Sequence, residues 1–138
     1  MLDKLYVYTD GASRNNPGEA SIGIVIFDKK ESVNPIDKYK DRIGKSTNNQ
    51  AEYNALIKGL ELASKLCKKE IFCFADSRLV VNQMKGEWKV KKKELKLLNE
   101  KAKKLEKMFE KVTYTNLPRE HPKIKMADKL ANEALDEK

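Results

Sequence analysis

The sequence has few cysteines and no long apolar run, and each absence excludes a class of protein. Its 138 residues include two cysteines, Cys67 and Cys73, which lie in apolar surroundings and form no CxxC pair. A structural zinc site and a disulfide framework are therefore not indicated, and buried reduced thiols in a cytoplasmic protein are expected instead. No apolar run approaches the roughly 18 residues of a membrane helix, so we expect no membrane span. Met1 leads almost directly into an apolar stretch, so we also expect no signal peptide.

Arginine is also scarce, and lysine carries nearly all of the positive charge. The chain has 29 lysines and arginines against 21 acidic residues, and its formal net charge is +8. A basic domain is a candidate for a polyanionic partner, of which nucleic acid is the commonest. A charged surface that only keeps the protein in solution explains the same balance. Charge alone leaves both interpretations open.

Apolar periodicity predicts five strands and four helices in the order β-β-β-α-β-α-α-β-α. The expected strands are residues 5–9, 20–27, 36–46, 71–75 and 112–117, and the expected helices are residues 47–69, 77–85, 93–111 and 126–135. Strand–helix–strand crossovers favour parallel pairing, so the first, fourth and fifth strands are expected to be parallel, beside an antiparallel hairpin at the edge. The expected fold class is α/β, with a mixed five-stranded sheet flanked by helices on both faces in a single domain, 1–138.

Two expected strands end on an aspartate. Asp10 follows the apolar run LYVYT and precedes small turn-forming residues, and Asp76 follows IFCFA. The carboxyl ends of neighbouring parallel strands meet at one edge of a sheet, where open α/β sheets bind ligands. Glu52 and Asp128 are each expected in the first turn of a helix, from which they could point to the same edge. We therefore expect these four carboxylates to converge.

Clustered carboxylates repel one another and raise each other's pKa, a cost that hard cations between them offset. Ligand sets made only of oxygen suit Mg²⁺ or Mn²⁺. Two such ions about 4 Å apart can activate water for attack on a phosphodiester and stabilise the leaving oxygen. A structural alternative exists for each residue. An Asp after a strand is commonly a turn or cap residue, Glu52 fits a capping box, and Asp128 could interact with a helix dipole.

Four blocks of sequence together resemble ribonuclease H of type 1. They are YTDGASRNNPG at 8–18, TNNQAEYNAL at 47–56, FADSRLVVNQM at 74–84 and ADKLANEAL at 127–135. They span nearly the whole chain in the order of the family. The resemblance implies a ribonuclease H-like fold. It also implies an endonuclease that cuts the RNA strand of an RNA–DNA hybrid with two metal ions, leaving 5′-phosphate and 3′-hydroxyl ends.

The resemblance also assigns roles to residues by motif position. The positions that match the family's metal-binding carboxylates are Asp10, Glu52, Asp76 and Asp128. Positions that touch the nucleic-acid backbone in the family are matched by Asn16, Thr47 and Asn49. Positions that read sugar hydroxyls or base edges across the minor groove are matched by Gly11, Ala12 and Asn48. Contact with the 2′-hydroxyl distinguishes RNA from DNA.

The chain departs from the family pattern in the loop before the last aspartate. Many members carry a catalytic histidine there, whereas His121 lies nearer to Asp128 than that pattern places it. A solvated loop residue is the alternative for His121. The loop PREHPKIKM resembles that of archaeal members without the histidine, and Arg119 could then assist electrostatically.

The second departure is a short span between Asp76 and Asp128, without the basic handle insertion of bacterial members. Trp88 is surrounded there by lysines, among them Lys91. A basic run with one aromatic suits contact with a nucleic-acid strand, and Trp88 in the core is the alternative. We expect a monomer that binds an RNA–DNA hybrid. A catalytically silent hybrid-binding module, a nuclease that also cuts RNA–RNA duplexes, and other chemistries of the wider superfamily remain as alternatives.

Overall fold

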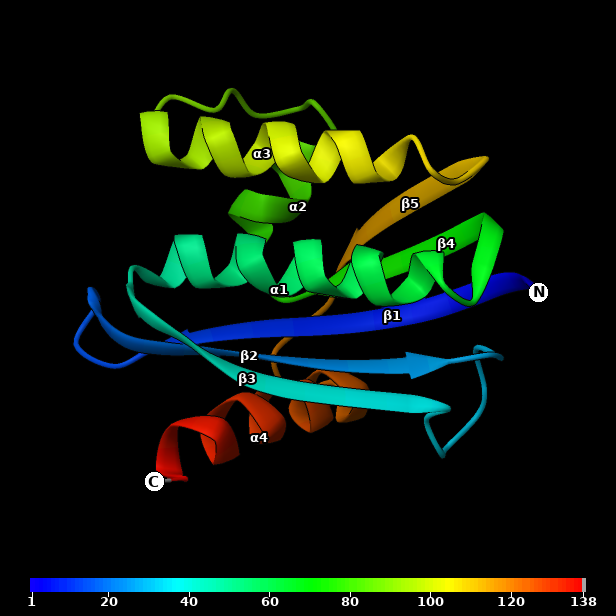
Figure 1. Ribbon diagram of the computed structural model, residues 1–138, viewed down its shortest axis with the longest axis horizontal. Helices are drawn as coiled ribbons and strands as arrows, with labels where there is room; N and C mark the ends of the chain where they lie inside the picture. The colour runs from blue at the N-terminus through cyan, green and yellow to red at the C-terminus, as the bar shows by residue number, and fades with distance from the viewer. Residues whose placement is uncertain (138) are drawn as a thin grey trace.

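Five strands form one mixed sheet in the computed structural model, which describes residues 1–137 (Figure 1). The strand order is β3-β2-β1-β4-β5. The strands are β1 (Leu2–Ser13), β2 (Gly18–Phe27), β3 (Asp37–Ser46), β4 (Cys67–Ala75) and β5 (Lys111–Asn116). β1 pairs antiparallel with β2 and parallel with β4, and β4 pairs parallel with β5. The predicted combination of a parallel centre and an antiparallel hairpin edge is confirmed.

Helices cover both faces of the sheet, as predicted. The helices are α1 (Asn48–Ser64), α2 (Arg78–Met84), α3 (Lys93–Glu106) and α4 (Pro122–Asp136). Figure 1 shows α1, α2 and α3 on one side of the strands and α4 on the other. None of these helices, within residues 1–137, is long and apolar enough to cross a membrane.

Each face of the sheet has its own buried cluster because the central strands are apolar on both faces. Leu5 and Val7 of β1 pack with α1 in the larger cluster. Tyr8 of β1 and Phe27 of β2 pack against Ile124 of α4 in the smaller one. The centre of the sheet is therefore packed between α1 and α4, the two helices that carry Glu52 and Asp128.

β1 is longer than its sequence predicts. We expected it to end on Asp10, but it continues to Ser13, pairing with β2 from Asp10 opposite Gly23 to Ser13 opposite Ala20. Its parallel pairing with β4 stops earlier, at Tyr8 opposite Phe74. The residues after Asp10 are small and have weak strand propensity, and pairing with β2 overrides that propensity.

Several other boundaries also differ from the prediction. α1 ends at Ser64, and Cys67 begins β4 instead of continuing the helix. α3 ends at Glu106, not at residue 111. α4 begins at Pro122 instead of residue 126, because proline is well suited to the first turn of a helix. The predicted loop 118–125 is therefore shorter.

Candidate active site

Asp10 and Asp76 lie at the same edge of the sheet. Asp10 sits two residues past Tyr8, the last residue of β1 that pairs with β4, and Asp76 is the first residue after β4. Side chains alternate along a strand, so Asp10 shares the face of Tyr8 and points toward α4. Asp10 is 5% exposed. The structure thus brings the two aspartates together where parallel β1–β4 pairing ends.

Glu52 reaches the same edge from α1. The capping box of α1 is formed by Thr47 and Gln50, whose side chains each accept a hydrogen bond from the other's backbone N–H, at 2.9 and 3.2 Å. The interpretation of Glu52 as the capping-box residue is wrong, as is its placement in the first turn, which carries no acidic residue. Because Gln50 closes the capping box, the Glu52 side chain is free to interact with β1. Its Oε1 accepts a hydrogen bond from the Gly11 backbone N–H at 2.5 Å.

Glycine at position 11 makes this approach possible. A Cβ atom on Gly11 would lie 2.3 Å from the backbone carbon of Ala51, so any larger residue would push α1 away from β1. Gly23 of β2 plays the same part for α4, because a Cβ there would lie 2.1 Å from the carbonyl oxygen of Ala127. These two close contacts place Glu52 and Asp128 on either side of Asp10.

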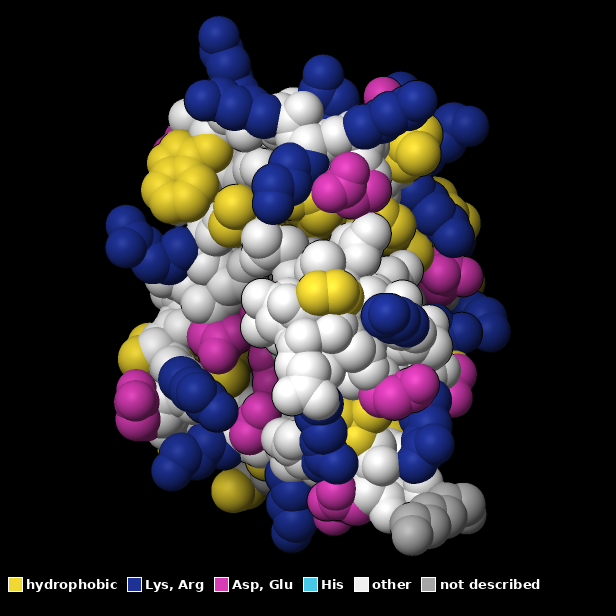
Figure 2. Space-filling model, turned by 90° about the vertical axis from the view of Figure 1, so that its left-hand side faces the viewer, with side chains coloured by type: hydrophobic (Ala, Val, Ile, Leu, Met, Phe, Trp, Pro, Cys, Tyr) yellow, Lys and Arg dark blue, Asp and Glu magenta, His cyan; other side chains and the backbone are white. Residues whose placement is uncertain are grey.

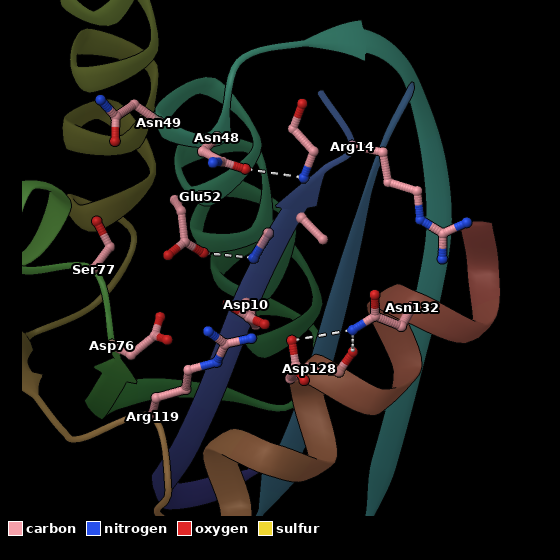
Figure 3. A pocket seen from close by; sticks show the side chains of 13 residues that line it. Asp10, Arg14, Asn48, Asn49, Glu52, Asp76, Ser77, Arg119, Asp128 and Asn132 are labelled. Atoms are coloured by element: carbon pink, nitrogen blue, oxygen red, sulfur yellow. Dashed lines mark hydrogen bonds between the residues drawn. The ribbon is translucent and has the colours of Figure 1, made fainter. Parts of the chain in front are cut away.

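The carboxylates of Asp10, Glu52 and Asp76 each offer an oxygen, and the three oxygens lie within 4.8 Å of one another (Figure 3). Burial raises the pKa of Asp10, and the nearby carboxyls of Glu52, Asp128 and Asp76 raise it further. Burial and the charge of Asp76 also raise the pKa of Glu52, whereas the hydrogen bond from the Gly11 N–H lowers it. Such a group of crowded oxygen donors fits a hard divalent cation.

Asp128 lines the same cleft from α4 but does not belong to the three-carboxylate group. It lies well inside α4, whose first turn carries no acidic residue, so the predicted first-turn position is wrong. Asn132, one helical turn further along, donates from its side-chain amide to Asp128. The amide nitrogen is 2.9 Å from the Asp128 carbonyl and 3.2 Å from its Oδ1. The amide holds the Asp128 carboxylate toward the cleft (Figure 3).

The cleft has a volume of about 430 Å³ and is lined by polar groups around the acidic cluster. Of the residues predicted to bind substrate or assist, it includes Gly11, Ala12, Asn48, Asn49 and Arg119. Figure 2 shows acidic side chains gathered in a hollow, with lysine and arginine side chains distributed around the rim of the same face.

Asn16 and Thr47 do not line the cleft. The Asn16 side-chain oxygen accepts a hydrogen bond from the Asn48 backbone N–H at 2.9 Å, and Thr47 caps α1. The Ser13 backbone N–H donates to Asn48 Oδ1 at 3.0 Å. The turn after β1 and the start of α1 are thereby joined. Contact of Asn16 and Thr47 with a nucleic-acid backbone stays a prediction.

His121 also lies outside the residues that line the cleft. It is the N-cap of α4, and its Nδ1 accepts a hydrogen bond from the Lys123 backbone N–H at 3.1 Å. Its ring stacks on Tyr8 with centroids 5.8 Å apart. The alternative of a solvated loop residue is therefore wrong, and His121 has a structural role here. Arg119, two residues earlier, points into the cleft (Figure 3).

Trp88 and Lys91 lie on the surface, outside the cleft lining. Trp88 is 43% exposed, which rules out its placement in the core. The Arg78 guanidinium lies over its ring, 5.8 Å from the centroid. Lys91 is exposed in the same segment between α2 and α3. Both side chains are available to a ligand, and their contact with substrate stays a prediction.

The sequence interpretation missed several cleft residues, which are Ser13, Arg14, Ser77 and Asn132. Asn132 could have been found, because a residue four positions after Asp128 lies on the same helical face. Arg14 could not have been found from the sequence, because its position depends on an ion pair of 2.6 Å with Asp136 near the end of the chain.

Comparisons with known proteins agree with this geometry. The family model described as "Reverse transcriptase-like" matches residues 8–134. A bifunctional protein of Mycobacterium tuberculosis is 42% identical over 133 residues, which cover 96% of this chain and 36% of that protein. The ribonuclease HI of Halobacterium salinarum is 39% identical over 134 residues, covering 97% of this chain and 65% of that protein. This chain thus spans only part of the length of both relatives.

Solved structures match the fold closely. The crystal structure of RNase H1 from Halobacterium salinarum aligns with a TM-score of 0.89 and 38% identity, over 96% of this chain and 98% of that one. LC11-RNase H1 in complex with an RNA/DNA hybrid aligns with a TM-score of 0.85 and 39% identity, over 96% of both chains. The resemblance drawn from four sequence blocks is confirmed. This chain belongs to the ribonuclease H family, type 1.

Proposed function

We propose that this protein is a divalent-metal-dependent endonuclease that hydrolyses the RNA strand of RNA–DNA hybrids, leaving 5′-phosphate and 3′-hydroxyl ends. The observation that carries the proposal is the convergence of Asp10, Glu52 and Asp76 within 4.8 Å, with Asp128 in the same cleft. A silent binding module has no need to keep carboxylates together against their mutual repulsion. The solved neighbour in complex with a hybrid supports the choice of substrate.

Asp10, Glu52, Asp76 and Asp128 would hold two ions, Mg²⁺ or Mn²⁺. Their donors are all carboxylate oxygens, which these ions prefer. The pKa of Asp10 and of Glu52 is raised by burial and by neighbouring carboxylates, so positive charge in the cluster relieves an existing repulsion. Bound divalent ions would supply the charge that activates water and stabilises the leaving oxygen of a phosphodiester.

The chain's own residues orient the cluster and the substrate. The Gly11 N–H fixes one oxygen of Glu52, and Asn132 fixes Asp128. Asn48 Oδ1 is occupied by Ser13, which leaves its amide nitrogen as the donor for a sugar hydroxyl. Arg119 adds a positive charge inside the cleft, where it can attract the scissile phosphate.

A cleavage assay with four labelled substrates tests the proposal. The substrates are an RNA–DNA hybrid, an RNA–RNA duplex, a DNA duplex and single-stranded RNA, each with Mg²⁺, with Mn²⁺ and with a chelator. We expect metal-dependent cleavage of the hybrid and products with 5′-phosphate ends. Binding of the hybrid without cleavage under any metal would favour the silent module, and cleavage of the RNA–RNA duplex would extend the substrate range.

We also propose that residues 1–138 act as one catalytic domain, as a monomer in the cytoplasm. Cys67 and Cys73 are free and buried, which supports a reducing compartment. Sedimentation of the active protein at assay concentration tests the monomer, and a stable dimer that alone cleaves the hybrid would contradict it.

A further inference from the structure

A buried polar network joins α1 to α2 and α3. Tyr53, the neighbour of Glu52 in sequence, is fully buried, and its hydroxyl donates to Gln83 Oε1 of α2 at 2.6 Å. The Asn99 side-chain amide of α3 donates to the Tyr53 hydroxyl oxygen at 3.1 Å. Gln83 itself is 6% exposed, so its amide has little access to water. A buried amide is stable only where both of its ends find partners.

The other end of Gln83 holds the segment 85–92, which links α2 to α3 (Figure 1). Its Nε2 donates to the carbonyl oxygen of Lys89 at 3.3 Å. Among the described residues 1–137, this is the one hydrogen bond to the backbone of residues 89–91. Val90 adds an apolar contact with the core. Residues 85–88 are held separately, and the N–H groups of Glu87 and Trp88 both donate to the Asn82 carbonyl, at 3.0 and 3.2 Å. Gln83 therefore links α1 to residues 89–91, the part of the segment with no other backbone hydrogen bond within the described chain.

The anchored segment carries the exposed groups that suit a nucleic-acid strand. Trp88 offers a flat face next to the Arg78 guanidinium. Lys91 is exposed three residues later. Arg78 is two residues from Asp76, so this aromatic and cationic surface begins beside the acidic cluster. Aromatic rings and cations together bind single strands by stacking and charge.

We propose that Gln83 is a positioning residue for substrate binding. It bridges the Tyr53 hydroxyl and the Lys89 carbonyl, and so holds residues 89–91, which follow Trp88 and include Lys91, in the place where the segment meets the nucleic acid. If the segment moved away, Gln83 would keep a buried donor without a partner, which disfavours other positions of the segment. Holding the segment before binding lowers the entropy lost on binding. The inference rests on the proposed function for the identity of the ligand.

Trp88 is the single tryptophan of the chain, so its fluorescence reports on this segment alone. We expect Gln83→Leu to increase acrylamide quenching of Trp88 in the absence of substrate. We also expect KM for the hybrid to rise about threefold to tenfold while kcat at saturation stays within about twofold, because one hydrogen bond that acts in binding is lost. The fluorescence measurement needs no activity, so it separates failure of this inference from failure of the proposed nuclease.

Tyr53→Phe is the second variant, because it removes one hydroxyl and keeps the ring. It should increase the quenching of Trp88 and the KM for the hybrid by a smaller amount than Gln83→Leu. If Gln83→Leu does not fold, the inference is tested with Tyr53→Phe. Tyr114→Phe is the matched control. Its hydroxyl donates to Glu106 at 2.8 Å and makes no hydrogen bond with residues 85–92. Quenching and KM should match the unmodified protein in this control.

Three outcomes would overturn the inference. The first is a folded Gln83→Leu, or Tyr53→Phe in its place, with unchanged quenching and KM. The second is a fall in kcat at constant KM, which would place the network in catalysis and not in binding. The third is an equal effect of Tyr114→Phe, which would mean that any lost tyrosine hydrogen bond loosens the segment.

Discussion

The acidic cluster should make the metal-free protein less stable as the pH rises, and Asp10→Asn should remove much of this effect. Burial and three neighbouring carboxyls raise the pKa of Asp10 above its ordinary value of 3.8. The folded state therefore keeps a proton that the unfolded state releases. Stability from this group is fully present below pH 3.8 and is lost progressively as the pH rises toward the raised folded pKa.

The magnitude follows from the number of protons that differ between the two states. One proton corresponds to a loss of about 1.4 kcal/mol in the free energy of unfolding for each pH unit. Between pH 5 and pH 7 the loss is then up to about 2.7 kcal/mol, or a fall in Tm of about 8 °C for a domain of this size. Glu52, whose pKa is also raised, acts in the same direction.

Urea or thermal denaturation in a chelator at pH 5, 6 and 7 measures how the free energy of unfolding changes with pH. In Asp10→Asn the free energy of unfolding should fall less steeply with pH, by up to the equivalent of about one proton. This variant should be more stable than the unmodified protein at pH 7. Asp3→Asn, at an exposed ion pair with Lys69, controls for the substitution. Added Mg²⁺ should restore the stability of the unmodified protein at pH 7. Equal pH dependence of the free energy of unfolding in the unmodified protein and in Asp10→Asn would mean that Asp10 keeps no extra proton in the folded state.

Three further predictions concern the lysines that begin at residue 91, the N-cap of α4 and the close contact between Gly11 and α1. Replacing Lys91, Lys92 and Lys93 with glutamine should weaken hybrid binding and flatten its salt dependence by about 3 in log–log slope, and an unchanged slope would mean that these lysines make no phosphate contact. His121→Ala should lower stability by about 1 kcal/mol in urea denaturation through loss of a cap. It should reduce the cleavage rate only modestly, and a loss as severe as that of a carboxylate variant would assign His121 a catalytic role. Gly11→Ala should cost about 1–3 kcal/mol and most of the activity because its Cβ meets α1.

The sheet could be predicted from sequence because its signals are local and strong. The apolar runs before Asp10 and Asp76 are uncharged. The antiparallel turns from β1 to β2 and from β2 to β3 leave β3 parallel to β1, and the crossover through α1 then makes β4 parallel to both. Both aspartates therefore follow the same end of the parallel strands, and the pairing of β1 with β4 brings them to one edge. The convergence of Glu52 and Asp128 on that edge was harder to predict, since it depends on close contacts at Gly11 and Gly23.

The errors came from places where tertiary contacts decide the local structure. β1 continues past Asp10 because β2 pairs with it, which nothing in the run of small residues indicates. Gln50 and not Glu52 closes the capping box, although both lie near the expected position. Pro122 was interpreted as part of a loop, yet proline after an N-cap residue starts α4.

Cleavage of the RNA strand in a hybrid by the unmodified protein and by Asp10→Asn tests directly whether the acidic cluster is catalytic. Both proteins are compared at hybrid concentrations where direct binding is equal, with Mg²⁺ and with Mn²⁺. We expect both proteins to bind the hybrid and only the unmodified protein to cut it. Sustained metal-dependent cleavage by Asp10→Asn would show that the acidic cluster is not the catalytic centre.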